Sequence, residues 1–515
     1  MRRALRVLFG LCAVSICFPA AWALPDDGPV STDFIDRPIQ AQLDKAGVAR
    51  VAKSDDAEFL RRIYLDLHGV LPTAEQAAQF LDDPAPSKRA GLINKLLDDP
   101  QFGRHFADIW RKALISPSVN EQRAQTDSFT AWLAQRFNDG DGWDEIVYDL
   151  MTATGKIEDN PSVVYLIEGR HPLGVTDLTD LTSRYFLGIR LNCAQCHDHP
   201  FAEWKRSDYW GMASFFAQIQ TPNRPKKVYM AGVVDDPKMT MDVLRDADML
   251  EGFQPQEPTF LGGDSLDSAS RDPHRVALAR WMTSPENPFF ARAAVNRIWW
   301  HFFGRGIVNP VDDMHSANEP SNEELLSGLS RHFVGNGFDV KHLCEAIANS
   351  RTYQQTSRPG EHGDRETELF ARMPVKVLTA EQLYDSLIAI LGAPTKGSFA
   401  PIGGPRNEFG QFFAGTGDPE PVRYDRGIPH VLRLMNSPQF AGRSVWALAH
   451  RLASSGSTVD EGIDELFLSF LSRRPTAAER QLVRDQLDVE NVDREAVYRE
   501  LAWVLLMSSE FSLNH

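Results

Sequence analysis

Two cysteines and a histidine in the middle of the chain form the segment best suited to chemistry. Cys193, Cys196 and His197 stand at the spacing C-x-x-C-H. Two thiols at this spacing can bind both vinyl groups of a haem, with the adjacent imidazole as an axial ligand of the iron. The spacing therefore predicts haem c, and with it electron transfer to a redox partner that the sequence does not identify.

The same donors also suit a metal ion. Cys193, Cys196, His197 and His199 offer four nitrogen and sulfur ligands of the kind that zinc and iron prefer. Closed tetrahedral sites usually draw on two separated pairs, so a cluster this crowded would need a donor from elsewhere. The donors considered are His171, His315, Asp312 and Asp313. This alternative predicts an exported metal-dependent enzyme of hydrolytic type, with the Gly- and Pro-rich stretch 395–424 near its substrate cleft.

A third interpretation needs no cofactor. In an oxidising compartment Cys193 and Cys196 would close a short disulfide, and the neighbouring histidines would make ordinary hydrogen bonds. The chain would then be a non-catalytic scaffold of the cell envelope. Cys344 is expected to be a buried small hydrophobe, because it lies on an apolar stripe with helical spacing.

Two predicted helices position the motif. A helix over 176–190 should deliver the chain directly to Cys193, and a second helix should follow Pro200. The second helix carries side chains that would surround a porphyrin: Trp204, Trp210, Met212, Phe215 and Phe216. The candidates for a second axial ligand of the iron are His199, Met212, Met230, Met239 and Met241. For a metal site, Met212 is considered together with His197 and His199.

The first 23 residues have the pattern of an export signal. Arg2, Arg3 and Arg6 precede an apolar stretch over 7–18, and the small residues of 21–23 suit a cleavage site. We therefore expect a mature chain that begins at Leu24 and is periplasmic or associated with the cell envelope. No later segment is apolar for long enough to span a bilayer.

Charge and cysteine content exclude some classes of protein. The chain of 515 residues has 70 acidic and 54 basic residues, a formal charge of −16, and no stripe rich in Lys and Arg. Nucleic acid is therefore not an expected partner. Only Cys193, Cys196 and Cys344 remain after cleavage, too few for a disulfide framework.

Helical periodicity dominates the rest of the chain, so the predicted fold is mainly α, with two helical domains joined by an extended and partly β connector. The expected boundaries are a signal peptide (1–23), a lead-in (24–54), a first helical domain that contains the motif (55–220), the connector (221–269) and a second helical domain (270–515). Thr73 with Gln76, and Thr476 with Glu479, are spaced as capping boxes.

The stretch 296–306 is rich in aromatic residues at helical spacing, which is typical of a core. Arg297 and Arg305 within it are expected to pair with Asp312 or Asp313, either as structural ion pairs or as an anion-binding site.

Long motifs in both halves resemble a known pair of domains. The segments 61–73 (RRIYLDLHGVLPT) and 193–201 (CAQCHDHPF) resemble the planctomycete cytochrome-c-like domain family, a domain of unknown function, over about 55–220. The segments 288–292 (PFFAR), 295–299 (VNRIW), 303–308 (FGRGIV) and 508–515 (SSEFSLNH) resemble its usual companion domain, over about 270–515.

This resemblance implies a c-type haem at Cys193, Cys196 and His197, because the family is named for its C-x-x-C-H. Many relatives carry an additional amino-terminal cytochrome module. Here only about thirty residues separate the predicted cleavage site from the first domain. The resemblance therefore implies one haem in this chain and no second electron carrier.

Overall fold

The computed structural model describes residues 31–115, 123–168, 174–221, 232–241, 256–267, 269, 271–391, 406, 409–410, 444–487 and 492–515. The predicted export signal, His171, Met230 and nearly all of the stretch 395–424 lie outside the described residues.

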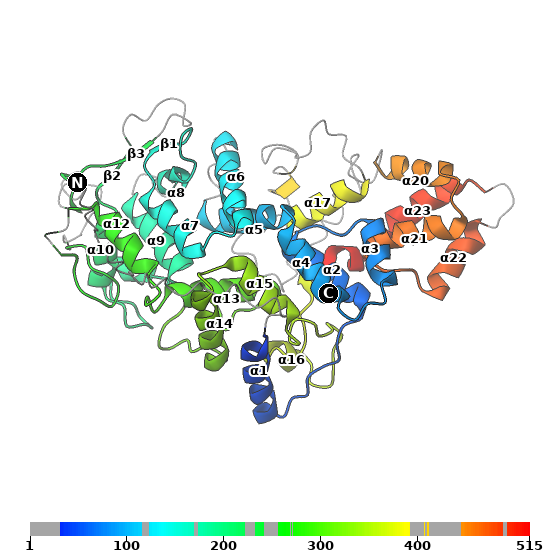
Figure 1. Cartoon of the computed structure of the whole chain (residues 1–515), viewed down its shortest axis with the longest axis horizontal. Coiled ribbons are helices and arrows are strands. Elements are labelled where there is room, and N and C mark those ends of the chain that lie inside the picture. The colour runs from blue at the N-terminus through cyan, green and yellow to red at the C-terminus, as the bar shows by residue number, and fades with distance from the viewer. Residues whose placement is uncertain are drawn as a thin grey trace, which may run out of the picture.

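The described residues are mainly helical, as the sequence predicts (Figure 1). The elements of the first half are α1 (Asp33–Ala46), α2 (Asp56–Leu67), α3 (Ala74–Asp82), α4 (Lys88–Asp98), α5 (Gln101–Leu114), α6 (Arg123–Asp139), α7 (Trp143–Thr152), β1 (Gly155–Lys156), α8 (Val163–Glu168), α9 (Val175–Phe186), the 3₁₀ helix η2 (Asn192–Gln195), α10 (Arg206–Ser214), β2 (Ile219–Gln220) and β3 (Gly232–Asp235).

The second half of the chain is also mainly helical. Its elements are α12 (His274–Met282), α13 (Phe290–Phe303), α14 (Glu323–Gly335), α15 (Val340–Asn349), α16 (Asp364–Glu368), β4 (Lys376–Val377), α17 (Ala380–Leu391), α20 (Ser444–Ser454), α21 (Val459–Leu471), α22 (Ala477–Leu487), α23 (Arg494–Met507), α24 (Ser509–Ser512) and β5 (Leu513–Asn514). No helix in the described part of the chain is both long enough and apolar enough to cross a membrane.

Both predicted capping boxes are present. The Thr73 hydroxyl accepts a hydrogen bond from the backbone N–H of Gln76, whose side chain accepts one from the backbone N–H of Thr73. Thr476 and Glu479 exchange the same two bonds before α22. These reciprocal contacts satisfy backbone donors that an isolated helix end leaves unpaired.

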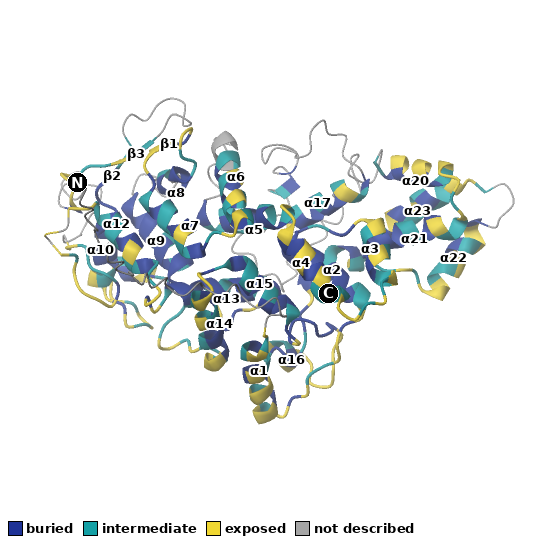
Figure 2. Ribbon diagram, in the orientation of Figure 1, coloured by how far each residue is buried: buried dark blue, intermediate teal, exposed yellow. Residues whose placement is uncertain are grey.

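Two hydrophobic cores hold the helices together (Figure 2). The larger core collects buried side chains from Ile35 to Met373, together with Leu468 of α21, so helices from both sides of the predicted connector contribute to it. The smaller core runs from Leu378 to Phe511 and includes Leu65 at the end of α2. Helix α2 is buried almost all round and joins the two cores.

Short strands lie around the predicted connector. β3 pairs antiparallel with both β1 and β2, in the order β1-β3-β2. Val233 and Val234, within the connector that was expected to be partly β, fall in β3. The sheet therefore ties the segment after α10 back to the segment after α7.

The helix before the motif is shorter than predicted. Helix α9 ends at Phe186, whereas the sequence predicts a helix that continues to residue 190. Gly188 follows with φ of +70°, a left-handed conformation that glycine adopts without steric cost and that turns the chain out of the helix. A turn, and not the helix itself, therefore leads to Cys193.

Candidate functional site

The two cysteines of the motif lie on a short turn at the surface. Cys193 is in η2, Cys196 follows directly after it, and both are exposed and free. Ala194 between them is fully buried. The carbonyl oxygen of Gln195 accepts a 3.0 Å hydrogen bond from the indole nitrogen of Trp210, which anchors the turn to α10. The two thiols therefore lie on the same solvent-exposed turn, which is anchored to α10.

His197 is oriented so that one ring nitrogen is left for a ligand. Its Nδ1 lies 2.8 Å from the backbone carbonyl oxygen of Asp198, and because a carbonyl only accepts, Nδ1 carries the proton. Nε2 is then the nitrogen with the lone pair, which is the usual arrangement of a histidine that ligates a metal. The Asp198 carboxylate accepts from the backbone N–H of Arg206, which fixes this segment to the start of α10.

His199 has the opposite arrangement. Its Nδ1 accepts hydrogen bonds from the backbone N–H groups of Phe201 (3.2 Å) and Ala202 (2.9 Å). An accepting Nδ1 places the proton of the neutral ring on Nε2, which then cannot donate a lone pair to a metal. The backbone of His199 also bonds to Trp204. His199 thus stabilises the loop after the motif, and in this conformation it is not poised as a ligand.

Of the other predicted metal donors, the structure brings His315 close to the motif. Its ring centroid is 6.1 Å from that of His199, and its Nε2 is 3.8 Å from Asp313. The Nδ1 of His315 accepts a backbone hydrogen bond, so its Nε2 is also protonated. Within the described part of the chain, no three His, Cys, Asp or Glu side chains are grouped so that they could hold a metal ion.

The predicted sulfur ligands and aromatic residues lie mostly inside the protein. Met212 and Met241 are buried in the larger core, and Met239 packs against it. Trp204, Trp210, Phe215 and Phe216 belong to the same core. Phe201 differs, because it is 76% exposed beside the motif. Phe201 therefore presents an exposed apolar ring in the loop that follows the motif.

Three arginines surround one buried carboxylate near the motif. Arg184, Arg190 and Arg297 all contact Asp312, which is 1% exposed. Burial alone would raise the pKa of Asp312, but the three guanidinium groups reverse this effect and lower the pKa. The expected pairing of Arg297 with Asp312 is confirmed. The ion pairs of Arg184 and Arg190 with Asp312 were not predicted from the sequence.

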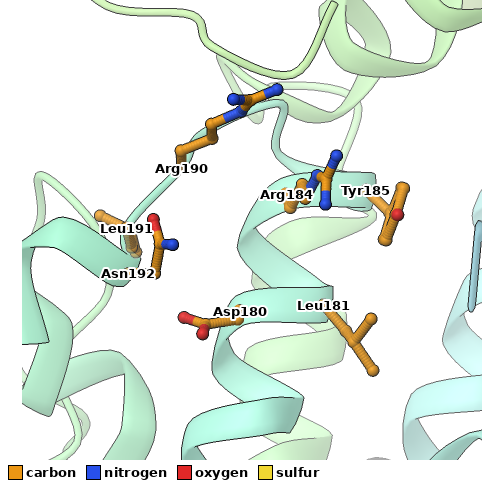
Figure 3. A pocket seen from close by; sticks show the side chains of 7 residues that line it. All are labelled: Asp180, Leu181, Arg184, Tyr185, Arg190, Leu191 and Asn192. Atoms are coloured by element: carbon orange, nitrogen blue, oxygen red, sulfur yellow. The ribbon is translucent and has the colours of Figure 1, made fainter. Parts of the chain in front are cut away.

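A pocket of about 240 Å³ lies between α9 and the turn that carries the cysteines (Figure 3). Its lining residues are Asp180, Leu181, Arg184, Tyr185, Arg190, Leu191 and Asn192. Asp180 and Arg184 stand one helical turn apart on α9. That spacing of opposite charges on an amphipathic helix is the sequence signal that could have found them.

Asp180 connects this pocket to the motif. Burial raises the pKa of its carboxyl group to about 6, and the nearby Asp177 adds to the effect, although a hydrogen bond with Tyr209 opposes it. Burial and Asp180 raise the pKa of the Tyr209 phenol, and Cys196 contributes as well. Asp180 and Cys196 therefore both raise the pKa of the same buried phenol.

Comparison with protein families finds two matches along the chain. Residues 34–221 match the PSCyt2 family, and residues 274–416 match the PSD1 family, each described as a protein of unknown function (DUF1549 and DUF1553). The chain carries a PSCyt2 domain followed by a PSD1 domain. The order of the two domains is the one expected from the sequence, and the C-x-x-C-H motif lies in the PSCyt2 domain. No curated protein and no solved structure shows a significant match.

Proposed function

We propose that this PSCyt2–PSD1 protein is an exported redox protein that binds one c-type haem at Cys193, Cys196 and His197. The haem iron would supply one-electron chemistry, and the protein would exchange electrons with a separate redox partner.

The orientation of His197 carries the proposal. Its Nδ1–H is held by the Asp198 carbonyl, so its Nε2 is available to an iron without any change in tautomer. His199 and His315 both keep Nδ1 as an acceptor, so a bare metal would have to displace backbone hydrogen bonds before either could ligate it.

The two thiols support the same assignment. Cys193 and Cys196 are exposed and free, as covalent attachment to a porphyrin requires. Phe201 exposes an apolar ring in the loop that follows the motif, and the bond from Trp210 to Gln195 holds the turn in place. Solvent access at this turn would also place one haem edge within reach of a partner.

The test is a pyridine haemochrome assay on protein from a host that matures c-type cytochromes. We expect about one covalently retained haem per chain. The Cys193→Ala, Cys196→Ala double variant should retain none, and Cys344→Ala, which removes a buried thiol outside the motif, should retain the full amount. Wild-type protein without covalent haem contradicts the proposal. Metal analysis and thiol titration of the same sample then distinguish a zinc or iron site from a Cys193–Cys196 disulfide.

A further inference from the structure

A loop of the PSD1 domain packs against the turn that leads to the motif. This loop lies between α13 and α14, and the backbone N–H of its Met314 donates a 2.9 Å hydrogen bond to the carbonyl oxygen of Gly188. A Cβ atom at Gly188 would lie 3.1 Å from the sulfur of Met314, so the two segments are in close contact. Arg190 donates to one carboxylate oxygen of Asp312 from Nε (3.0 Å) and from Nη2 (2.6 Å). The loop therefore holds the chain up to three residues before Cys193.

The same loop also contacts the chain on the other side of the motif. The hydroxyl group of Ser316 donates a 2.8 Å hydrogen bond to the carboxylate of Glu203, which follows the motif. The ring centroids of His315 and His199 are 6.1 Å apart. Residues 312–316, here called the motif clamp, thus hold both the segment that enters the motif and the segment that leaves it.

The motif clamp is itself supported by paired backbone groups. Asn296 of α13 is fully buried, and its side-chain nitrogen donates to the carbonyl oxygens of Val308 and Val311, both at 2.9 Å. Its side-chain oxygen accepts from the backbone N–H of Val308 at 3.0 Å. Asn318 donates to the carbonyl oxygen of Asp313. A loop whose polar groups are satisfied in this way keeps one conformation, so it can fix the position of a neighbouring segment.

We propose that the motif clamp positions the C-x-x-C-H segment, so that the ligand site of the PSCyt2 domain is completed by the PSD1 domain. Asp312 and Ser316 are positioning residues, because they act through Arg190 and Glu203 and not on the ligand itself. A ligand site keeps its geometry only when the residues around it hold its supporting segments in place. The inference deepens the proposed function and rests on it only for the identity of the ligand.

The first experiment uses the full chain without haem and measures hydrogen exchange in residues 199–204 by mass spectrometry. The reporters are the backbone N–H groups of Phe201 and Ala202, which are hydrogen-bonded to His199. Ser316→Ala should speed their exchange about fivefold, since a hydrogen bond that holds this loop is lost. Ser316→Thr keeps a hydroxyl group and should restore the wild-type rate.

A matched control separates positioning from a general loss of stability. The hydroxyl group of Ser327 donates to Glu323 on α14, so Ser327→Ala removes a bond of the same kind from the same domain. This variant should leave exchange in residues 199–204 unchanged. Equal exchange rates in that stretch for Ser316→Ala and Ser327→Ala would overturn the proposal.

Arg190→Gln tests the end of the motif clamp that lies before the motif. It should speed exchange of the backbone N–H of Ile189, which donates to the carbonyl oxygen of Ser183. Urea denaturation shows whether Arg190→Gln still folds. If it does not, the comparison at Ser316 still decides, because Ser316 is exposed and its substitution leaves the core intact.

The second experiment uses haem-loaded protein and asks whether the positioning reaches the ligand. Ser316→Ala should lower the reduction midpoint relative to wild type and to Ser327→Ala. A looser segment admits water to the haem, and water stabilises the more positive oxidised iron. An unchanged midpoint would show that the motif clamp is structural only, and it would overturn the proposal. If the wild type retains no haem, the proposed function fails, and the exchange experiment on the haem-free chain alone decides this inference.

Discussion

The ammonium group of Lys376 lies 2.6 Å from a carboxylate oxygen of Asp66, and both side chains are buried. Lys376 also donates to the carbonyl oxygens of His301 and Phe302, and Asp66 accepts from Tyr353 as well. Lys376 is in β4 and Asp66 is in α2, so this ion pair joins the PSCyt2 domain to the PSD1 half of the chain. Burial lowers the pKa of Lys376, and Asp66 counteracts that effect.

Lys376→Met should destabilise the protein by about 3 kcal/mol, because it leaves the Asp66 carboxylate buried without its cation. The free energy of unfolding is measured by urea denaturation. Arg280→Met, which removes an exposed ion pair with Asp272, should leave the free energy of unfolding almost unchanged. The double variant Lys376→Met, Asp66→Asn should recover part of the lost free energy of unfolding, because the unpaired carboxylate is gone. If the double variant is as unstable as the sum of the two single changes, the two residues are not energetically coupled.

Arg61 provides a second connection between the halves of the chain. It is fully buried and donates to the backbone carbonyl oxygens of Phe470, Glu510, Phe511 and Leu513, and burial lowers its pKa to about 10. Arg61→Lys keeps the charge but cannot reach all four acceptors. We expect faster hydrogen exchange in residues 508–515, measured by mass spectrometry. The free energy of unfolding should fall by about 2–3 kcal/mol. Arg37→Lys at the surface should leave that exchange unchanged, and equal rates in both variants would contradict this role for Arg61.

Local features of the fold could be predicted from the sequence because neighbouring residues determine them. The capping boxes at Thr73 and Thr476 and the buried position of Cys344 depend on spacings within one helix turn or stripe. The end of α9 was predicted too late, because the apolar pattern continues through Ile189 although Gly188 already turns the chain.

The buried polar contacts could not be predicted in this way. Lys376 and Asp66 are 310 residues apart, and Asn514, which also donates to Asp66, is 448 residues away from it. A single buried polar residue produces no periodicity, and only the tertiary fold determines its partner. The C-x-x-C-H motif was visible from its spacing, whereas the different tautomers of His197 and His199 depend on backbone groups that the loop brings to each ring.

The carboxyl group of Asp180 should make stability depend on pH. Its pKa in the folded protein is about 6, above the usual value of 3.8, so the folded state binds a proton at this carboxyl group more tightly than the unfolded chain does. Protonation of Asp180 therefore stabilises the folded state at low pH, and this stabilisation is lost as the pH rises from about 4 through 6. Asp180→Asn cannot ionise, so the variant avoids the cost of a buried carboxylate at neutral pH. Its melting temperature relative to wild type should therefore increase between pH 4.5 and pH 7, by the equivalent of about 2 kcal/mol. Asp208→Asn, at a partly exposed residue that accepts from the backbone N–H of Lys205 at the start of α10, is the control. A pH-independent difference for Asp180→Asn would contradict the raised pKa.

His197 and His199 should respond differently to removal once haem is attached. In His197→Ala we expect the covalent haem to remain, because the thiols hold it, while the absorption spectrum shows the loss of an imidazole ligand. In His199→Ala the spectrum should be unchanged, but the melting temperature should fall, because the backbone N–H groups of Phe201 and Ala202 lose their acceptor. Both are measured on the same samples by absorption spectroscopy and thermal unfolding. A spectral change in His199→Ala as large as that in His197→Ala would show that His199 also ligates the iron, against the tautomer that its hydrogen bonds select.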